Sequence, residues 1–313
     1  MERQMPEAKD AALIRDIAAF LSSREKGSWQ LRRVVSRDKS EGFEAVFHAR
    51  AADGRQLAVK QCAHPRKTIN EYHALQRLAE SSGESLRAFA LDPQSRFFAM
   101  EWVDAPLVKQ MMHEPNRLEL IQAAGRWLRR LHDRTWRTTP LRDPAMEGAL
   151  LIDPQGSCFR ELDRRLARRR RRLGIRRSGH ALLHTDYHIG NIFAGPNGLI
   201  PFDPTARRRG MPVFDLADFL TVLMVYRHHA AFQGRPWPDS RAVDRREFLK
   251  GYGRFSWPQR RLMGFAQDLK IARMWHHHAK LRTLTPLQKA EHELLDAEMR
   301  RRGLLPKALS AAG

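Results

Sequence analysis

Cysteine and long apolar runs are both scarce in this sequence. Its 313 residues include two cysteines, Cys62 and Cys158, which lie far apart without metal-site spacing. One such pair makes a structural disulfide improbable, so we expect a reducing compartment. No run approaches the roughly 18 apolar residues of a membrane-spanning helix, and the opening residues lack the apolar core of a signal peptide. We therefore expect a cytoplasmic protein, with peripheral contact to the inner membrane face as an open alternative.

Acidic residues are also few in comparison with basic ones. The chain has 35 Asp and Glu against 56 Lys and Arg, which gives a formal net charge of +21. Such an excess attracts anions, including nucleic acid, anionic lipid head groups and acidic substrates. The alternative is that the excess of basic residues reflects only the arginine-rich coding habit of a GC-rich genome. With 42% apolar and 8% aromatic residues, the chain is globular and long enough for one large domain or two lobes.

The most basic stretch is Arg160–Arg177, which includes five consecutive arginines, Arg168–Arg172. A thin stripe of leucines and an alanine predicts a helix here. Three interpretations stay open: a solvated face, a contact with an acidic acceptor or anionic membrane, and a nucleic-acid contact. The nucleic-acid interpretation is the least favoured, because the run has no aromatic residues to stack on bases.

Strand-like patterns dominate the first third of the chain after a predicted amphipathic helix at 8–22. Apolar alternation predicts strands at 29–35, 43–49 and 56–62, and Asp53-Gly54 predicts a tight hairpin between the last two. Strands joined by such short turns make an antiparallel sheet.

Lys60 ends the third of these strands, and Glu71 follows eleven residues later. A strand lysine alone is usually solvated. Thr68 and Glu71 also match the capping box that begins a helix, which would direct the carboxylate to a backbone N–H. The functional alternative is an ion pair in which Glu71 positions the Lys60 ammonium on nucleotide phosphates.

Beyond a further strand at 96–103, which ends before a proline, the pattern becomes mainly helical. We expect helices at 118–131, 215–232, 244–253 and 258–283, and a last one that begins at Thr285-Pro286. Residues 133–157 are expected to form a long irregular connection. The consecutive histidines 276–278 would point in three directions on a helix, which argues against a metal site there.

Three polar residues follow one another in the middle of the chain at suggestive intervals. Asn191 lies five residues after Asp186, and Asp203 lies twelve further on. The apolar runs between them predict short buried strands with the polar residues on the connecting loops. In phosphoryl transfer one carboxylate orients the attacking hydroxyl, while an Asn and a second carboxylate hold Mg²⁺ against the phosphates.

The pattern His184-x-Asp186-x4-Asn191, then Asp203, then Asp215-Leu216-Ala217, resembles the aminoglycoside phosphotransferase and choline kinase-like family. The resemblance implies an α+β fold of the protein-kinase-like, two-lobed type. Residues 1–103 would form a small lobe with the nucleotide-binding antiparallel sheet and a helix. Residues 104–313 would form a helical lobe with the catalytic loop, the metal site and the acceptor site.

The resemblance also implies individual roles in the second lobe. Asp186 would be the catalytic base or hydroxyl-orienting carboxylate, and Asn191 and Asp203 would bind Mg²⁺. His184 and Asp215 would support the catalytic loop. The sequence departs from the family where Pro201-Phe202-Asp203-Pro204 replaces the more frequent Ile-Asp-Phe.

In the first lobe, the resemblance implies a site for ATP. Lys60 would contact the α- and β-phosphates with Glu71 as its partner, and the backbone from Glu101 to Val103 would hydrogen-bond the adenine. The glycine-rich pattern that usually covers the phosphates is missing from the sequence. Relatives in this family often lack it.

The expected reaction is Mg-ATP-dependent transfer of the γ-phosphate to a hydroxyl of a small molecule or glycan. The basic composition disfavours a polycationic aminoglycoside and favours an anionic acceptor, such as an acidic sugar of the cell envelope. The alternative is a catalytically silent scaffold that binds anionic membrane or nucleic acid. A protein substrate is disfavoured, because no Ala-Pro-Glu follows Asp203.

Overall fold

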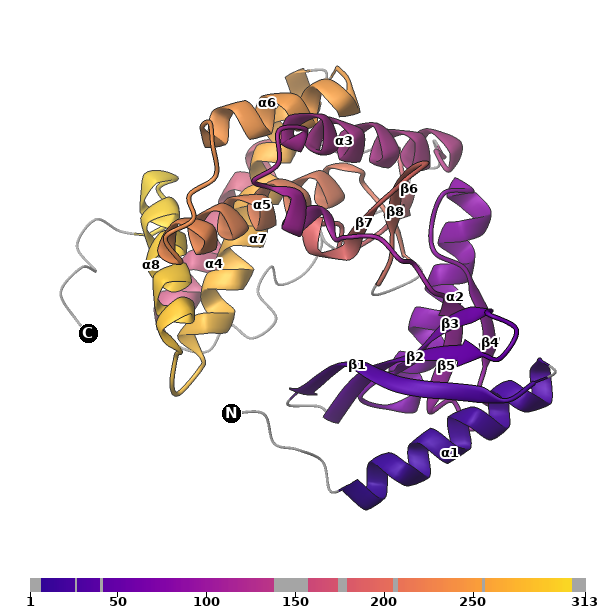
Figure 1. Ribbon diagram of the computed structural model, residues 1–313. Coiled ribbons are helices and arrows are strands. Elements are labelled where there is room, and N and C mark those ends of the chain that lie inside the picture. The colour runs from indigo at the N-terminus through magenta and orange to yellow at the C-terminus, as the bar shows by residue number, and fades with distance from the viewer. Residues whose placement is uncertain are drawn as a thin grey trace. The chain divides into compact units, whose positions relative to one another are not determined.

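The computed structural model describes residues 7–25, 27–39, 42–137, 157–173, 179–204, 208–254 and 257–305. Figure 1 traces them as a mixed α and β fold. Contacts group the chain into two compact units, Met1–Ala105 with Ile200–Arg207, and Pro106–Leu199 with Arg208–Gly313. The lobe boundary near residue 103 stays a prediction. No helix in the described ranges has both the length and the apolar character needed to cross a membrane.

The first unit is built on a five-stranded antiparallel sheet with the strand order β1-β2-β3-β5-β4. The strands are β1 (Trp29–Lys39), β2 (Gly42–Ala51), β3 (Gln56–Gln61), β4 (Ala88–Leu91) and β5 (Phe97–Glu101). The predicted hairpin is present, since Gly54 takes φ +89° and donates its N–H to Ala51 O at 3.0 Å. β4 is too short for its pattern to predict it.

Two helices cover opposite faces of this sheet. Neighbouring residues of a strand point to opposite faces. Phe97 of β5 meets Phe20 of α1 (Glu7–Arg24), with ring centroids 5.3 Å apart. The next residue, Phe98, meets Tyr72 of α2 (Pro65–Ser82) at 6.0 Å. One apolar cluster of this unit therefore lies on the α1 face, and buried side chains of α2 such as Leu75 and Leu78 pack on the other face.

The start of α2 corrects one sequence interpretation. The helix begins at Pro65, and His64 is the N-cap residue, whose Nδ1 accepts the N–H of Lys67 at 3.2 Å. Thr68 is buried inside the first turn. The capping box of Thr68 and Glu71 is therefore wrong, because proline at the first helical position places the N-cap at His64, four residues earlier.

The second unit is mainly helical. Its helices are α3 (Arg117–Arg134), α4 (Ser157–Leu173), α5 (Val213–Phe232), α6 (Arg241–Tyr252), α7 (Trp257–Ala279) and α8 (Pro286–Arg301), with the 3₁₀ turns η1 (Val108–Met111) and η3 (Ile189–Asn191). Short strands form two pairs, β6 (Ala181–Leu183) with β9 (Arg208–Gly210), and β7 (Ile192–Gly195) with β8 (Gly198–Pro201). The predicted helices are all present, although α7 ends four residues earlier than expected. The irregular connection at 133–157 and the end of the basic stretch lie largely outside the described residues.

Close packing of α3 on α6 fixes part of this helical frame. A Cβ added to Gly125 would lie 2.2 Å from Phe248 O, and one added to Gly251 would lie 2.0 Å from Gln122 O. Phe248 in turn stacks on Phe219 of α5, with ring centroids 4.1 Å apart. Glycine at the crossing thus lets the backbones approach, and α5 is held against the pair by aromatic contact.

Candidate active site

The first unit brings three of the predicted site residues together. Lys60 Nζ lies 2.6 Å from Glu71 Oε2 and also forms an ion pair with Asp203 Oδ1. The Lys60 side chain is 11% exposed, so a solvated strand lysine is excluded. Of the two interpretations of Glu71, the ion pair is the one that the structure contains.

Electrostatics hold the Lys60 ammonium in its charged form. Burial acts to lower the pKa of Lys60, but the carboxylates of Asp203 and Glu71 outweigh burial and raise it. Glu71 also accepts from Cys62 Sγ at 3.3 Å and lies 3.7 Å from Lys67 Nζ. Burial raises the pKa of the Cys62 thiol to about 12, and the Glu71 charge adds to this effect. The sequence analysis missed Lys67, although its i,i+4 spacing to Glu71 is a detectable signal.

Asp203 reaches Lys60 from an unusual backbone conformation. Its φ of +61° lies in the left-handed region, where non-glycine residues are uncommon. The neighbouring Pro201 is fixed by a bond from Leu86 N–H to its carbonyl at 3.3 Å. The altered Pro201–Pro204 segment therefore still presents a carboxylate to Lys60.

The predicted adenine-binding residues lie at the end of β5. The Glu101 N–H donates to Arg87 O at 2.9 Å, and Glu101 Oε2 accepts the Arg87 N–H at 3.0 Å. The roles of Glu101 and Val103 in binding adenine stay predictions.

The second unit holds Asp186 and Asn191 in one hydrogen-bonded loop. Asn191 Nδ2 donates to Asp186 Oδ2 at 2.9 Å and to Asp186 O at 3.1 Å. His188 Nε2 lies 3.6 Å from Asp186 Oδ1, while its Nδ1 accepts the Gly190 N–H at 3.0 Å. Sequence analysis missed His188, although it lies inside the motif. The Asp186 carboxylate is thus oriented from two sides.

Asp215 supports this loop from the first turn of α5. Its buried carboxylate accepts the N–H groups of His184 at 2.8 Å and Thr185 at 2.9 Å, and lies 3.2 Å from His132 Nε2. Thr185 has φ +69°, which is a strained conformation for a β-branched residue. The His184 ring packs against Tyr187, with centroids 5.4 Å apart. Asp215 therefore secures the bend that precedes Asp186.

The environment keeps Asp186 ionised at neutral pH. Burial acts to raise the pKa of Asp186, but the hydrogen bond and charge of His188 and the charges of Lys270 and His184 outweigh it and lower the pKa. An ionised carboxylate can accept a hydrogen bond from an alcohol and orient its oxygen for attack.

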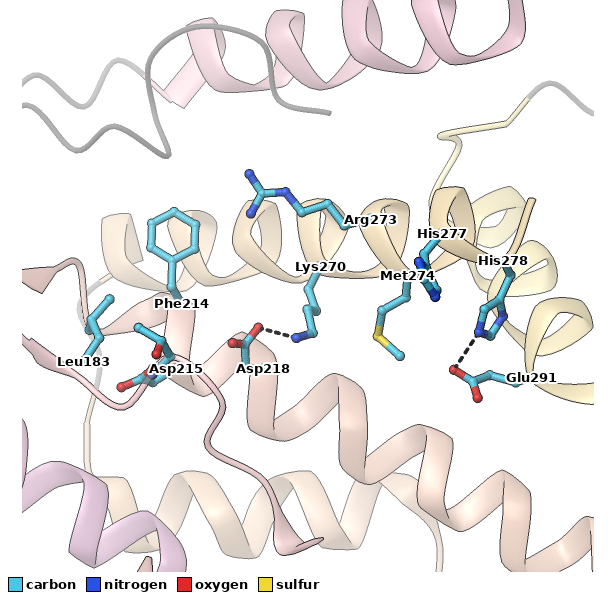
Figure 2. Close-up of a pocket in the computed structure, with 11 residues that line it drawn as sticks. Leu183, Phe214, Asp215, Asp218, Lys270, Arg273, Met274, His277, His278 and Glu291 are labelled. Atoms are coloured by element: carbon cyan, nitrogen blue, oxygen red, sulfur yellow. Dashed lines mark hydrogen bonds and ion pairs between the residues drawn. The ribbon is translucent and has the colours of Figure 1, made fainter. Parts of the chain in front are cut away.

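A cavity of about 440 Å³ opens beside this loop within the second unit. Figure 2 shows residues of its walls, with Lys270 of α7 directed at Asp218 of α5. Their charged atoms are 3.2 Å apart. Burial raises the pKa of Asp218 to about 6, although the Lys270 charge opposes this change. Thr185 also lines the cavity, and Asp186 is the next residue in the chain. The cavity therefore reaches the loop that holds Asp186.

The donor chemistry of Asn191 and Asp203 fits Mg²⁺. Asn191 directs its amide nitrogen at Asp186, so its amide oxygen is the atom that could bind a cation. Mg²⁺ is typically held by one or two protein oxygens together with water and phosphate oxygens. Across the described ranges, no group of three or more His, Cys, Asp or Glu residues could hold a metal. Asn191 and Asp203 each carry an oxygen of the kind that Mg²⁺ prefers, and their role as its ligands stays a prediction.

Comparison with known proteins identifies the family and the fold. A family model described as "Phosphotransferase enzyme family" matches residues 37–263. No curated protein gives a significant sequence match. The structure is similar to amicoumacin kinase hAmiN in complex with AMP-PNP, Ca²⁺ and Ami, with 15% identity, a TM-score of 0.61, and coverage of 95% of this chain and 97% of that one.

Two further solved structures have the same fold. A choline/ethanolamine kinase family protein from Mesorhizobium loti has 16% identity and a TM-score of 0.64, with coverage of 95% of this chain and 97% of that one. Choline kinase LicA from Streptococcus pneumoniae has 11% identity and a TM-score of 0.62, with coverage of 93% and 99%. The predicted α+β, protein-kinase-like fold is therefore confirmed, as is the resemblance drawn from the motif.

Proposed function

Because the chain belongs to the phosphotransferase enzyme family, we propose that it transfers the γ-phosphate of Mg-ATP to a hydroxyl of a small molecule or glycan with an anionic group. An acidic sugar of the cell envelope is one such acceptor. The observation that carries the proposal is the loop in which Asn191 and His188 orient an ionised Asp186 carboxylate.

In this proposal, Asp186 accepts the hydrogen bond of the acceptor hydroxyl and takes its proton as the phosphoryl group is transferred. The reaction needs positioning and neutralisation of charge more than covalent help from the protein. Asn191 and Asp203 would hold Mg²⁺, which, when bound, neutralises phosphate oxygens. Asp215 acts through the loop and not on the substrate.

The nucleotide site would lie on the first unit. Lys60, held by Glu71 at 2.6 Å, would place its ammonium on the α- and β-phosphates. The carbonyl of Glu101 and the backbone of Val103 would bind the adenine edge. The hAmiN structure contains the ATP analogue AMP-PNP, which supports ATP as the donor here.

An anionic acceptor is favoured by the net charge of +21, since cationic substrates are repelled by such a field. We include a cytoplasmic location and a peripheral contact of the basic stretch with anionic membrane in the proposal. The contact with membrane has weaker support than the location. In α4, Arg165 and Arg168 pair with Glu161, and Arg169 pairs with Asp268, so part of this charge is neutralised within the chain.

The test is a phosphorylation assay with γ-labelled ATP and a pool of small metabolites and glycans, with Asp186→Asn as the blank. We expect labelled products that form with the wild-type protein and not with the Asp186→Asn blank. The acceptors from which they form should be anionic. Salt-sensitive binding to liposomes or RNA without any labelled product would instead favour the silent scaffold.

A further inference from the structure

We propose that the second unit binds a chloride-sized anion in a small cavity between α5, α6 and α7, and that Arg245 is its chief ligand. Apolar side chains of α5 line part of this cavity, and its polar lining includes Arg245 of α6 and Gln267 of α7. The inference goes beyond the proposed function and is independent of it, because no residue of the catalytic loop takes part.

Arginines outnumber carboxylates where α6 and α7 meet the end of α8. The Glu298 carboxylate accepts N–H groups at 3.1, 2.6 and 2.7 Å from three arginines, Arg241, Arg301 and Arg302. Asp268 pairs with Arg302 at 2.8 Å and also with Arg169 of α4. Four positive charges thus share two negative ones. The carbonyl end of α8 offsets part of this excess, since cations are favourable at a helix C-terminus.

Arg245 adds a further positive charge to this group without a carboxylate of its own. It lies one turn after Arg241 on α6. Its Nη1 donates to Gln267 Oε1 at 3.0 Å, and within the described ranges it forms no ion pair. Burial lowers the pKa of Arg245, and the charges of Arg302 and Arg241 lower it further. An anion beside Arg245 would relieve this repulsion.

The carboxylate in the cavity lining does not supply the missing charge. Asp244 is the one carboxylate among the described lining residues. It is 2% exposed and pairs with Arg117 and with Arg227, the second at 2.6 Å. Arg117 also pairs with Asp239 at 2.8 Å. These two arginines and two aspartates balance one another, so the positive charge at Arg245 stays uncompensated.

The cavity has the size and the donors that a small anion needs. Its volume of about 20 Å³ is enough for one water-sized species, which is too little for a metabolite. The amide oxygen of the buried Gln267 accepts from Arg245, so its amide nitrogen is a second N–H donor at the same place. A water molecule could fill the space but would leave the charge uncompensated. A chloride ion accepts both N–H groups and neutralises the guanidinium.

The first test compares thermal unfolding in sodium chloride with unfolding in sodium gluconate at one ionic strength, so that general screening is equal. Gluconate is too large for the cavity. The measure is the Tm in chloride minus the Tm in gluconate. We expect this difference to be about 2–5 °C larger in the wild type than in Arg245→Gln, because an anion that binds only the folded state stabilises it. An equal difference in both proteins would overturn the inference.

Three variants separate anion binding from a purely structural role of Arg245. In gluconate, Arg245→Gln should unfold at the same temperature as the wild type or higher, because it removes a charge that faces like charges. Arg245→Lys keeps the charge and should keep part of the chloride response. Arg246→Gln changes an exposed arginine of the same helix that pairs with Glu247, and it should respond as the wild type does. A purely structural Arg245 would instead give Arg245→Gln the same loss of Tm in both salts.

Anomalous diffraction from crystals grown in bromide then locates the anion directly. We expect a bromide peak beside the Arg245 guanidinium and the Gln267 amide nitrogen in the wild type, and no such peak in Arg245→Gln. A wild-type crystal with a water molecule at this place, and with bromide only elsewhere, would overturn the inference. Neither readout depends on phosphate transfer, so a failure of the proposed function would leave this result unchanged.

Discussion

Lys60 Nζ of β3 lies 2.6 Å from Glu71 Oε2 in the second turn of α2. We predict that Glu71→Gln lowers kcat/KM about 10- to 100-fold, a typical loss for a residue that orients a liganding group. The protein should stay folded, since Lys60 keeps Asp203 as a partner. Steady-state kinetics with ATP as the varied substrate measure the effect. Glu80→Gln, on the exposed side of the same helix, should change kcat/KM less than twofold, and a similar loss in both variants would refute the role of Glu71.

Asp215 is expected to hold the catalytic loop as a buried acceptor. Asp215→Asn replaces a carboxylate that meets two N–H groups and a histidine ring. It should lower the free energy of unfolding by about 1–3 kcal/mol, the cost of a buried polar group left badly paired. Urea unfolding gives this value. Asp133→Asn, at an exposed pair with Arg129, should cost less than about 1 kcal/mol, and equal costs would contradict the assignment.

Alanine should destabilise the protein at Gly125 and stabilise it at Gly264, because only Gly125 lies where α3 contacts α6. Gly125→Ala would place a Cβ 2.2 Å from Phe248 O, so it should destabilise the fold by about 1–3 kcal/mol or more through overpacking. Gly264→Ala lies within α7 and meets nothing within 4 Å. It should stabilise the protein by about 0.5–1 kcal/mol, because alanine loses less entropy in a helix. Thermal unfolding of both variants would show opposite shifts, and shifts of the same sign would refute the packing.

Asp218 gives a pH-dependent prediction. Burial raises its folded-state pKa to about 6 from an ordinary value of 3.8. The fold therefore favours the protonated form, and this stabilisation is present below the ordinary pKa and is lost as the pH rises through about 6. The free energy of unfolding of the wild type minus that of Asp218→Asn should fall between about pH 4.5 and about pH 6.5 and then level off. A difference that stays constant, or that rises, would contradict the raised pKa.

Much of the fold was predictable because its signals are local. Apolar alternation predicted the strands of the sheet, and Asp53-Gly54 predicted their hairpin, since both depend on neighbouring residues. The start of α2 was mispredicted because two local signals competed. His64 and Pro65 set the observed start, and the capping box at Thr68 was the weaker signal.

The candidate site was predictable only in part, because only some of its contacts join residues that are close in the sequence. The spacing of Asp186 and Asn191 carries the motif, so their place in one loop could be inferred from the sequence. The pair of Asp218 with Lys270 joins two helices through tertiary packing, and nothing in either segment reports the other. The wall of the cavity beside the Asp186 loop therefore needed the structure.

We propose that the Asp186 carboxylate takes the proton of the acceptor hydroxyl during phosphoryl transfer. The most direct measurement is the single-turnover rate of Asp186→Asn with γ-labelled ATP and the acceptor isolated from the pool, alongside the dissociation constant of ATP. We predict a loss of rate of about 10²- to 10⁴-fold, the usual contribution of a general base, with ATP affinity within about twofold of the wild type because Asp186 is not a nucleotide ligand. A variant that transfers phosphate at the wild-type rate would contradict the account.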